Sequence, residues 1–327
     1  MKKNKKVLIT GITGQDGIFL SKELVENDDY EIIGVSRNYN LNSFNKKLKT
    51  LKFDLNKFQN IKIINIDLTE TLEVKKLVRS YKFDFVYNLS GPSSVYESIK
   101  SPQKSKMEIL LIFNNLIDSF VEENYFPNFF QASSSEMFNE QPTENITEEI
   151  RLSPTSPYGK AKAEIHENIS LIRNKYDWNI SSGIMFNHES EFRKSEYLFQ
   201  KVINGAKNIS QKKLKTLKIG SLSYERDWTF AGDVSKAMIE IINYGSESSY
   251  VIGSGKSHSI EYFISLVFDH FNLNWNNHIE VDSSLLRAGD PEKITCDPSR
   301  LIKELNWKPE YTFENLVERC VLKSMEN

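Results

Sequence analysis

Short apolar segments alternate with longer stretches of helical pattern through the first half of the chain, and this alternation constrains the fold more than any other feature. The segments KVLIT, YEIIGV, IKIINI, FDFVYNL and NFFQAS are apolar almost throughout, which is typical of strands buried on both faces of a sheet. Between them lie the helical stretches LSKELVEN, TLEVKKLVRSY and KMEILLIFNNLIDSFVEE. The alternation predicts an α/β protein with a doubly wound parallel sheet.

The alternation ends after NISSGIMF (Asn179–Phe186), which is predicted to be a further strand. The remainder mixes short helices, turns such as IGSGKSHS and a closing amphipathic helix after LNWKPEYT. We therefore expect a nucleotide-binding domain over residues 1–186. A smaller mixed α/β part that binds substrate is expected over residues 187–327, with some chain returning to the first domain. Such a part covers the crevice at the strand ends, where ligands of open α/β sheets bind.

Charge and composition exclude several classes of protein. The 327 residues carry a net charge of −2, which gives no overall attraction for nucleic acid. No apolar run approaches the roughly 18 residues needed to span a bilayer, and the basic start MKKNKK does not lead into a signal peptide. Cys296 and Cys320 have no metal or redox spacing, so no metal site is expected. We expect a cytoplasmic protein in which both cysteines are small buried side chains.

One heptapeptide, KKLKTLK, occurs twice, at Lys46–Lys52 and at Lys212–Lys218. Nothing around the two copies matches, so they do not indicate an internal repeat of structure. Both are predicted to be solvated faces.

The stretch GITGQDG lies between the first predicted strand and the first predicted helix. Gly11, Gly14 and Gly17 meet the demands of a dinucleotide-binding turn: a tight turn, close approach of the backbone to a pyrophosphate, and close helix–strand packing. The helix N-terminus would then offer free N–H groups to phosphate. An ordinary strand–helix turn is the alternative, but the position after the first strand favours a Rossmann-type dinucleotide site.

The end of the second predicted strand bears on the identity of the cofactor. An NAD-binding protein usually has an acidic residue there, which binds the ribose hydroxyls. Here YEIIGVSRN ends in Ser36 and Arg37, and an arginine suits the 2′-phosphate of NADP. We therefore expect NADP rather than NAD, with a surface arginine as the alternative.

Four residues form a predicted catalytic group. Tyr158 and Lys162 in SPYGKAK stand four apart on a helical segment, so that they share one face, and a nearby ammonium favours the phenolate. Upstream, in ASSSEMF, Ser134 could hydrogen-bond the substrate hydroxyl that Tyr158 deprotonates. Glu136 adds a carboxylate that a simple dehydrogenase does not need. The alternatives are a surface Tyr–Lys pair and local capping by ASSSEMF.

These motifs resemble the GDP-mannose 4,6-dehydratase family of extended short-chain dehydrogenases. Six further stretches carry the same resemblance: SFN (Ser43–Asn45), DLT (Asp67–Thr69), YNL (Tyr87–Leu89), FNHES (Phe186–Ser190), ERDW (Glu225–Trp228) and LNWKPE. The similarity runs from about Lys6 to about Glu310. The resemblance implies a redox-neutral dehydration through bound NADP. In it Tyr158, assisted by Lys162, takes the proton of the sugar's 4-hydroxyl, and Glu136 takes the C5 proton as water leaves C6.

The resemblance also implies binding residues. Those expected at the cofactor are Gly11, Gly14, Gln15, Asp16, Gly17, Arg37, Asp67, Leu68, Tyr158 and Lys162. Those expected at the substrate are Ser93, Asn187, Arg193, Lys201, Arg226 and Arg287. The second of two family arginines after the second strand is Asn38 here, which weakens the case for NADP. His188 fits no ligand cluster and is expected to be structural.

Two departures bear on the substrate. The family's NHESPRRGE is here NHESEFRKS, and its AQSHV is here GPSSV (Gly91–Val95). The nucleotide sugar is therefore expected to be GDP-mannose or GDP-N-acetylglucosamine. A nucleotide-sugar epimerase or 4-ketoreductase on the same scaffold remains an alternative, and Glu136 argues against it. A non-catalytic NADP-binding regulator is the second alternative, and the presence of both Tyr158 and Lys162 argues against that. Family members pair through two long helices, so we expect a homodimer or a homotetramer.

Overall fold

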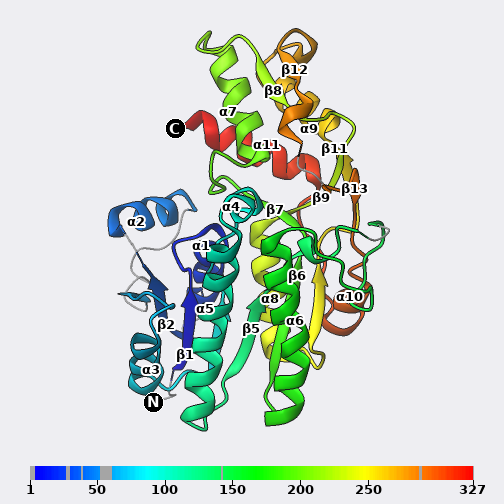
Figure 1. The fold of residues 1–327 in the computed structure, drawn as a ribbon. Helices are drawn as coiled ribbons and strands as arrows, with labels where there is room; N and C mark the ends of the chain where they lie inside the picture. Colours follow the sequence, from blue (N-terminus) through cyan, green and yellow to red (C-terminus); the bar gives the residue numbers. More distant parts are fainter. Residues whose placement is uncertain are drawn as a thin grey trace.

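A computed structural model describes residues 4–26, 30–37, 40–51, 61–140, 143–286 and 289–326. Its centre is a parallel sheet of seven strands in the order β10-β6-β5-β4-β1-β2-β3 (Figure 1). The strands are β1 Lys5–Thr10, β2 Tyr30–Ser36, β3 Ile61–Asn65, β4 Phe85–Asn88, β5 Asn128–Ala132, β6 Ile180–Met185 and β10 Ser249–Ile252. The predicted α/β fold with a doubly wound parallel sheet is confirmed.

Helices cover both faces of the sheet, which explains why its strands are apolar almost throughout. On β1, Val7 and Ile9 belong to one core cluster, whereas Leu8 belongs to a second cluster on the opposite face. The first face is covered by α1 (Gln15–Val25), α2 (Leu41–Thr50) and α8 (Ala231–Tyr244), and the second by α3 (Thr71–Ser80), α5 (Pro102–Glu122) and α6 (Pro157–Tyr176). Burial on both faces leaves no position in these strands for a polar alternation.

The chain returns to the sheet after residue 187. Strand β10 pairs with β6 at the edge of the sheet, and α8 packs against α1, β5 and β6. The short helix α10 (Ser299–Leu305) packs against both β10 and α8. Sequence reasoning expected such crossings but did not identify β10, because four residues, SYVI, give too short a pattern.

The remaining elements form a smaller part that stands beyond the carboxyl ends of the parallel strands (Figure 1). One sheet contains β7 (Asn187–Glu189), β9 (Glu225–Phe230), β11 (Ser257–Ser259) and β13 (Lys293–Ile294), and β8 (Leu217–Ile219) pairs with β12 (Ile279–Val281). Around them pack α7 (Leu198–Ser210), α9 (Ile260–His270) and α11 (Phe313–Glu326). Their core is aromatic: Trp228 stacks on Phe313 at 5.2 Å, and Phe199 stacks on Phe263 at 4.5 Å.

The described residues contain neither a membrane-spanning helix nor a metal-binding cluster. None of the helices in the described ranges is long and apolar enough to cross a membrane. The same residues contain no cluster of three or more His, Cys, Asp or Glu side chains that could hold a metal ion.

Candidate active site

The glycine loop has the backbone geometry that a dinucleotide requires. Gly11 has φ of +68°, a conformation that side chains other than glycine rarely adopt. A Cβ at Gly17 would lie 2.5 Å from the Cα of Ile12, so only glycine lets α1 begin this close to the end of β1. Gly14 is the N-cap of α1 and provides no side-chain cap, which leaves first-turn N–H groups of the described helix for a phosphate. These residues fit a dinucleotide.

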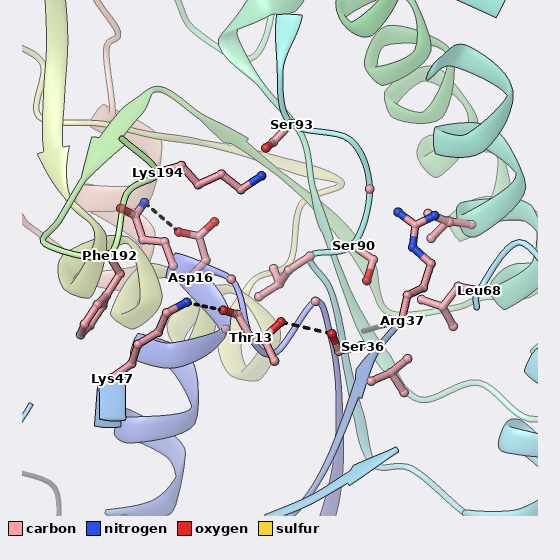
Figure 2. Close-up of a pocket in the computed structure, with 18 of the residues that line it drawn as sticks. Thr13, Asp16, Ser36, Arg37, Lys47, Leu68, Ser90, Ser93, Phe192 and Lys194 are labelled. Carbon is pink, nitrogen blue, oxygen red and sulfur yellow. Dashed lines mark hydrogen bonds between the residues drawn. The ribbon is translucent and has the colours of Figure 1, made fainter. Parts of the chain in front are cut away.

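A cleft with a volume of about 510 Å³ opens beside this loop, within the size range of small-ligand sites (Figure 2). Its walls come from the ends of β1, β2 and β4, from α2, and from the loop that follows β7. The predicted residues among those that line it are Gly11, Gly14, Gln15, Asp16, Gly17, Arg37, Asp67, Leu68, Ser93 and Arg193.

Gln15 and Asp16 are bound to the strand that enters the smaller part. The Gln15 amide donates to the His188 carbonyl oxygen at 3.1 Å and accepts from the Ser190 hydroxyl at 2.7 Å. The Asp16 carboxylate lies 3.0 Å from Nε2 of His188, whose Nδ1 faces the Phe186 carbonyl oxygen at 2.8 Å. Although burial opposes the charge on both groups, the pairing raises the pKa of His188 and lowers that of Asp16. The nucleotide loop and the FNHES segment are thus joined by one polar network.

Arg37 is engaged by acidic side chains. Its guanidinium lies 2.7 Å from a Glu108 carboxylate oxygen on α5 and 4.0 Å from Asp67. Asp67 in turn accepts from the amide and the hydroxyl of Thr69, and these hydrogen bonds help to lower its pKa against the opposing effect of desolvation. The Asn38 position, where the family has its second arginine, lies outside the described residues.

The first turn of α6 positions Tyr158, the predicted catalytic base. Ser156 is the N-cap, its hydroxyl accepts from the Gly159 N–H at 2.9 Å, and Pro157 occupies the first helical position. Tyr158 is buried, and its hydroxyl is hydrogen-bonded to the Ser134 side chain. Burial raises the pKa of the Tyr158 phenol, and the negative charge of Glu136 adds to this, against the lowering effects of Ser134 and Arg193.

Lys162 lies one turn further along α6, as predicted. Its ammonium donates to the Ala132 carbonyl oxygen at 2.8 Å and stands 5.7 Å from the centre of the Tyr158 ring. Burial lowers the pKa of Lys162 to about 8. Burial dominates the pKa of the phenol, and the Lys162 ammonium is directed at a backbone carbonyl, so its effect on the phenolate stays a prediction.

Glu136 lies beside Tyr158 because two backbone segments approach closely. It belongs to the short helix η2 (Ser135–Met137), and a Cβ at Gly159 would lie 2.3 Å from the Glu136 carbonyl oxygen. The Glu136 carboxylate accepts from the Asn139 amide at 2.9 Å. Ser134 also accepts from the Glu136 N–H at 3.2 Å, so the capping alternative is present together with the catalytic arrangement. The structure therefore brings all four predicted catalytic residues into one cluster.

Two of the predicted substrate residues line the cleft. The Ser93 hydroxyl lies 3.0 Å from the Tyr197 hydroxyl, and the Arg193 guanidinium stacks on the Tyr197 ring at 3.9 Å. Arg193 also lies 3.4 Å from the buried Glu189 carboxylate. Both Arg193 and Tyr197 act electrostatically on Tyr158, so this wall adjoins the catalytic cluster.

The other predicted substrate residues in the described ranges do not line the cleft. Asn187 is on β7 and does not line the cleft, and the Lys201 ammonium donates to the Lys218 carbonyl oxygen at 2.8 Å. Arg226 is buried and lies 3.2 Å from Asp290, and its guanidinium donates to the carbonyl oxygens of Glu225 and Glu292. Arg287 lies outside the described residues.

Several residues of the cleft were not identified from the sequence. They are Thr13, Ser36, Lys47, Ser90, Phe192, Lys194 and Tyr197. Lys47 belongs to the first KKLKTLK copy, where the prediction of a solvated face is wrong: it is half-buried, and its ammonium donates to the Thr13 carbonyl oxygen at 2.9 Å. Thr13 stands inside the glycine motif, and this was the one local signal available.

Comparison with solved structures defines the class. The chain superposes on a dTDP-glucose 4,6-dehydratase from Bacillus anthracis, solved in complex with NAD, with a TM-score of 0.82 and 18% identity over 99% of this chain and 97% of the other. It superposes on a UDP-N-acetylglucosamine 4-epimerase from Methanobrevibacter ruminantium with a TM-score of 0.84 and 20% identity over 99% of each chain. The protein thus has the fold shared by these nucleotide-sugar dehydratases and epimerases.

Sequence comparison identifies the family. The model of the GDP-mannose 4,6 dehydratase family matches residues 8–320. A GDP-mannose 4,6 dehydratase of Arabidopsis thaliana is 30% identical over 333 residues, covering 100% of this chain and 91% of its own. One from Vibrio cholerae is 29% identical, with 99% and 94% covered. The chain belongs to the GDP-mannose 4,6-dehydratase family.

Proposed function

We propose that this chain is an NADP-dependent 4,6-dehydratase that converts a GDP-hexose to its 4-keto-6-deoxy form. Its family membership supports GDP-sugar dehydration. The single observation that carries the reaction type is the placement of Glu136 beside Tyr158 and Ser134, since an epimerase or a 4-ketoreductase needs only Ser134, Tyr158 and Lys162.

The cofactor would be held by the glycine loop and the strand ends around the cleft. Gly11, Gly14 and Gly17 would admit the pyrophosphate, and Asp67 and Leu68 would lie on the adenine side. When bound, the nicotinamide dinucleotide supplies a reversible hydride acceptor, so the sugar can be oxidised at C4 and reduced at C6 without net consumption of the cofactor.

Tyr158 acts as the base for the 4-hydroxyl. The hydroxyl of Ser134, already hydrogen-bonded to the phenol, would hold the sugar oxygen and complete the path of its proton. Burial raises the pKa of the Tyr158 phenol, so a positive charge beside the phenol is needed for Tyr158 to act as a base. Lys162 and Arg193 are the nearby side chains that supply such charge.

Glu136 acts on the neighbouring carbons. Once C4 carries a ketone, the C5 hydrogen is acidic enough for a carboxylate to remove it. Elimination of the C6 hydroxyl as water then needs one proton, which Glu136 can return. The Asn139 amide, bound to Glu136 at 2.9 Å, would orient the carboxylate for both transfers.

The substrate would lie against the wall that Ser93, Arg193 and Tyr197 form. Arginine binds diphosphate through its planar fork, and Arg193 is the predicted arginine that lines the cleft beside Tyr158. Asn187, Lys201, Arg226 and Arg287 remain proposed substrate residues. The hexose is mannose or N-acetylglucosamine, because the GPSSV and NHESEFRKS stretches depart from the family pattern where the sugar binds.

We also propose a cytoplasmic homodimer, or a homotetramer built from it, with a cofactor domain over 1–186 and a substrate part over 187–327. Met107 on α5 and Leu171 on α6 are 62% and 66% exposed, and apolar side chains of this size on neighbouring helices fit a helix-pair interface. Sedimentation of the purified protein as a monomer would contradict the dimer.

The test is product analysis by mass spectrometry, with GDP-mannose and GDP-N-acetylglucosamine offered separately. Loss of one water from either, with no consumption of added NADPH, supports the dehydratase and names its sugar. Glu136→Gln is expected to keep cofactor binding and lose dehydration. An undiminished product yield in that variant would contradict the role of Glu136.

A further inference from the structure

Lys47 places a positive charge on the glycine loop from an element outside the motif. It lies on α2, and one of its three N–H donors goes to the Thr13 carbonyl oxygen at 2.9 Å (Figure 2). Its side chain lines the same cleft as the loop glycines. The ammonium is therefore held at the edge of the dinucleotide site and not directed to bulk water.

The charge on Lys47 has no described counterion. Within the described part of the chain, no carboxylate lies within ion-pair distance of its ammonium, and the Thr13 carbonyl oxygen is its one hydrogen-bond acceptor. Burial lowers the pKa of Lys47, and the positive charge of Lys194 lowers it further. Lys194 lines the same cleft and extends into it (Figure 2). An anion bound beside Lys47 would offset both the burial of its charge and the effect of Lys194.

Arg37 is differently placed, although it is the residue that the sequence favours as a phosphate ligand. Its guanidinium already lies 2.7 Å from Glu108 and 4.0 Å from Asp67. A phosphate bound to Arg37 would have to approach both carboxylates or displace them. The arginine therefore forms part of the adenine-side wall rather than a free anion site.

Two hydroxyl groups line the cleft at and beyond the loop residue that Lys47 contacts. The Thr13 and Ser36 hydroxyls lie 3.2 Å apart, at the ends of β1 and β2, and both line the cleft. The end of the second strand is where dinucleotide folds bind the 2′ position of the adenine ribose. Hydroxyl donors and an ammonium suit a phosphate monoester, whereas a carboxylate would suit the free ribose hydroxyls of NAD.

We propose that Lys47, together with Thr13 and Ser36, binds the 2′-phosphate of NADP and is the residue by which this chain distinguishes NADP from NAD. This inference rests on the proposed dinucleotide-dependent function. It assigns the distinction between NADP and NAD to a residue of α2. In the family pattern two arginines follow the second strand, and the second of them is Asn38 here.

Calorimetric binding of adenosine 2′,5′-bisphosphate and of 5′-AMP tests the proposal without any sugar substrate or turnover. Lys47→Gln is expected to weaken binding of the 2′,5′-bisphosphate about tenfold to a hundredfold, the usual range for loss of a charge-assisted hydrogen bond, and to leave 5′-AMP unchanged. Lys47→Arg keeps the charge and should retain most of the preference. Lys213→Gln, at the equivalent position of the second KKLKTLK copy, is the matched control and should change neither ligand. Arg37→Gln should weaken the 2′,5′-bisphosphate less than Lys47→Gln does.

Other outcomes overturn the proposal in distinguishable ways. Equal weakening of both ligands by Lys47→Gln would place its charge at the 5′-phosphate or pyrophosphate. A larger loss in Arg37→Gln would return the discrimination to the arginine. A wild-type protein that binds NAD and NADP equally would refute the role of Lys47 and leave the dinucleotide site standing. Failure to bind either dinucleotide would refute the proposed function itself.

Discussion

The same six residues, KKLKTL, adopt different structures in the two parts of this molecule. In the cofactor half, residues 46–50 are the last part of helix α2. In the substrate half, the second copy begins at Lys212, whose φ is +58°, directly after α7, and ends in strand β8. The two copies lie in well-separated parts of the molecule (Figure 1). Because the residues are identical, the difference comes entirely from what surrounds them.

The surroundings decide which leucine each copy buries. In the first, Leu48 is fully buried against the core beneath α1, as helical periodicity from Phe44 requires. In the second, Leu217 is buried as β8 pairs with β12, whereas Leu214 is 39% exposed. The second lysine of each copy also lies in a different environment. Lys47 contacts the glycine loop, whereas Lys213 is exposed. The contact of Lys47 with the glycine loop is thus a property of tertiary position and not of its local sequence.

The largest expected difference between the copies is at the first leucine. Leu48→Ala should lower the free energy of unfolding by about 3 kcal/mol, because it leaves a cavity under α2. Leu214→Ala, at the equivalent position of the second copy, should cost less than about 1 kcal/mol. Urea unfolding followed by circular dichroism measures both. Equal losses would show that the two copies are buried alike.

Much of the fold can be predicted from local sequence, because a long apolar segment has a pattern of its own. The structure of KKLKTLK cannot be predicted in this way, because its surroundings decide it. The strands from β1 to β6 lie within apolar stretches of five to eight residues that are bounded by helical patterns, so the alternation along the chain identifies them. Strand β10 has four residues, and β7, β8 and β11 have three, and their pairing depends on segments far along the chain. Short strands have no pattern of their own to detect.

The site divides in a similar way. Tyr158 and Lys162 share one helix, and Ser134 and Glu136 share one turn, so spacing places each pair, and Gly159 lets the two pairs meet. Lys47 and Tyr197 enter the cleft only through the packing of α2 and the loop before α7, which spacing does not describe. Spacing also does not describe the raised pKa of Tyr158, because burial is a property of the folded molecule.

The second prediction inverts the first. Leu217→Ala should lower the free energy of unfolding by about 2 kcal/mol, since a Cβ at Gly205 would lie 2.7 Å from Leu217, which shows how closely α7 approaches β8. Leu51→Ala, its counterpart in the first copy, removes a partly buried side chain and should cost about 1 kcal/mol. The order of the two losses in urea is the test. A greater loss at Leu51 would mean that α2 packs more tightly on the core than the structure shows.

The third prediction has opposite signs in the two copies. Lys46→Gly should destabilise the protein by about 1 kcal/mol, since glycine is a poor residue inside a helix. Lys212→Gly should stabilise it by about 0.5–1 kcal/mol, because it relieves the left-handed conformation of a residue with a Cβ. Thermal unfolding of both variants beside wild type is sufficient. A loss of stability in Lys212→Gly would contradict the backbone assigned to the second copy.

The smallest expected effect is a dependence on pH that isolates Lys47. Burial and Lys194 lower the pKa of Lys47 in the folded protein, whereas in the unfolded chain it titrates near 10.4. Between those two values the unfolded state binds more protons, so the contribution of Lys47 to stability rises with pH across this window. The stability of wild type relative to Lys47→Met should therefore increase from pH 8 to pH 10, as measured by urea midpoints. Lys213→Met removes the same charge from an exposed site and corrects for the change in net charge.

NADP should oppose the trend, because a phosphate beside Lys47 favours its charged form. If the stability of wild type relative to Lys47→Met falls with pH in the absence of ligand, a carboxylate already neutralises this lysine. That result would contradict the proposed anion site at α2.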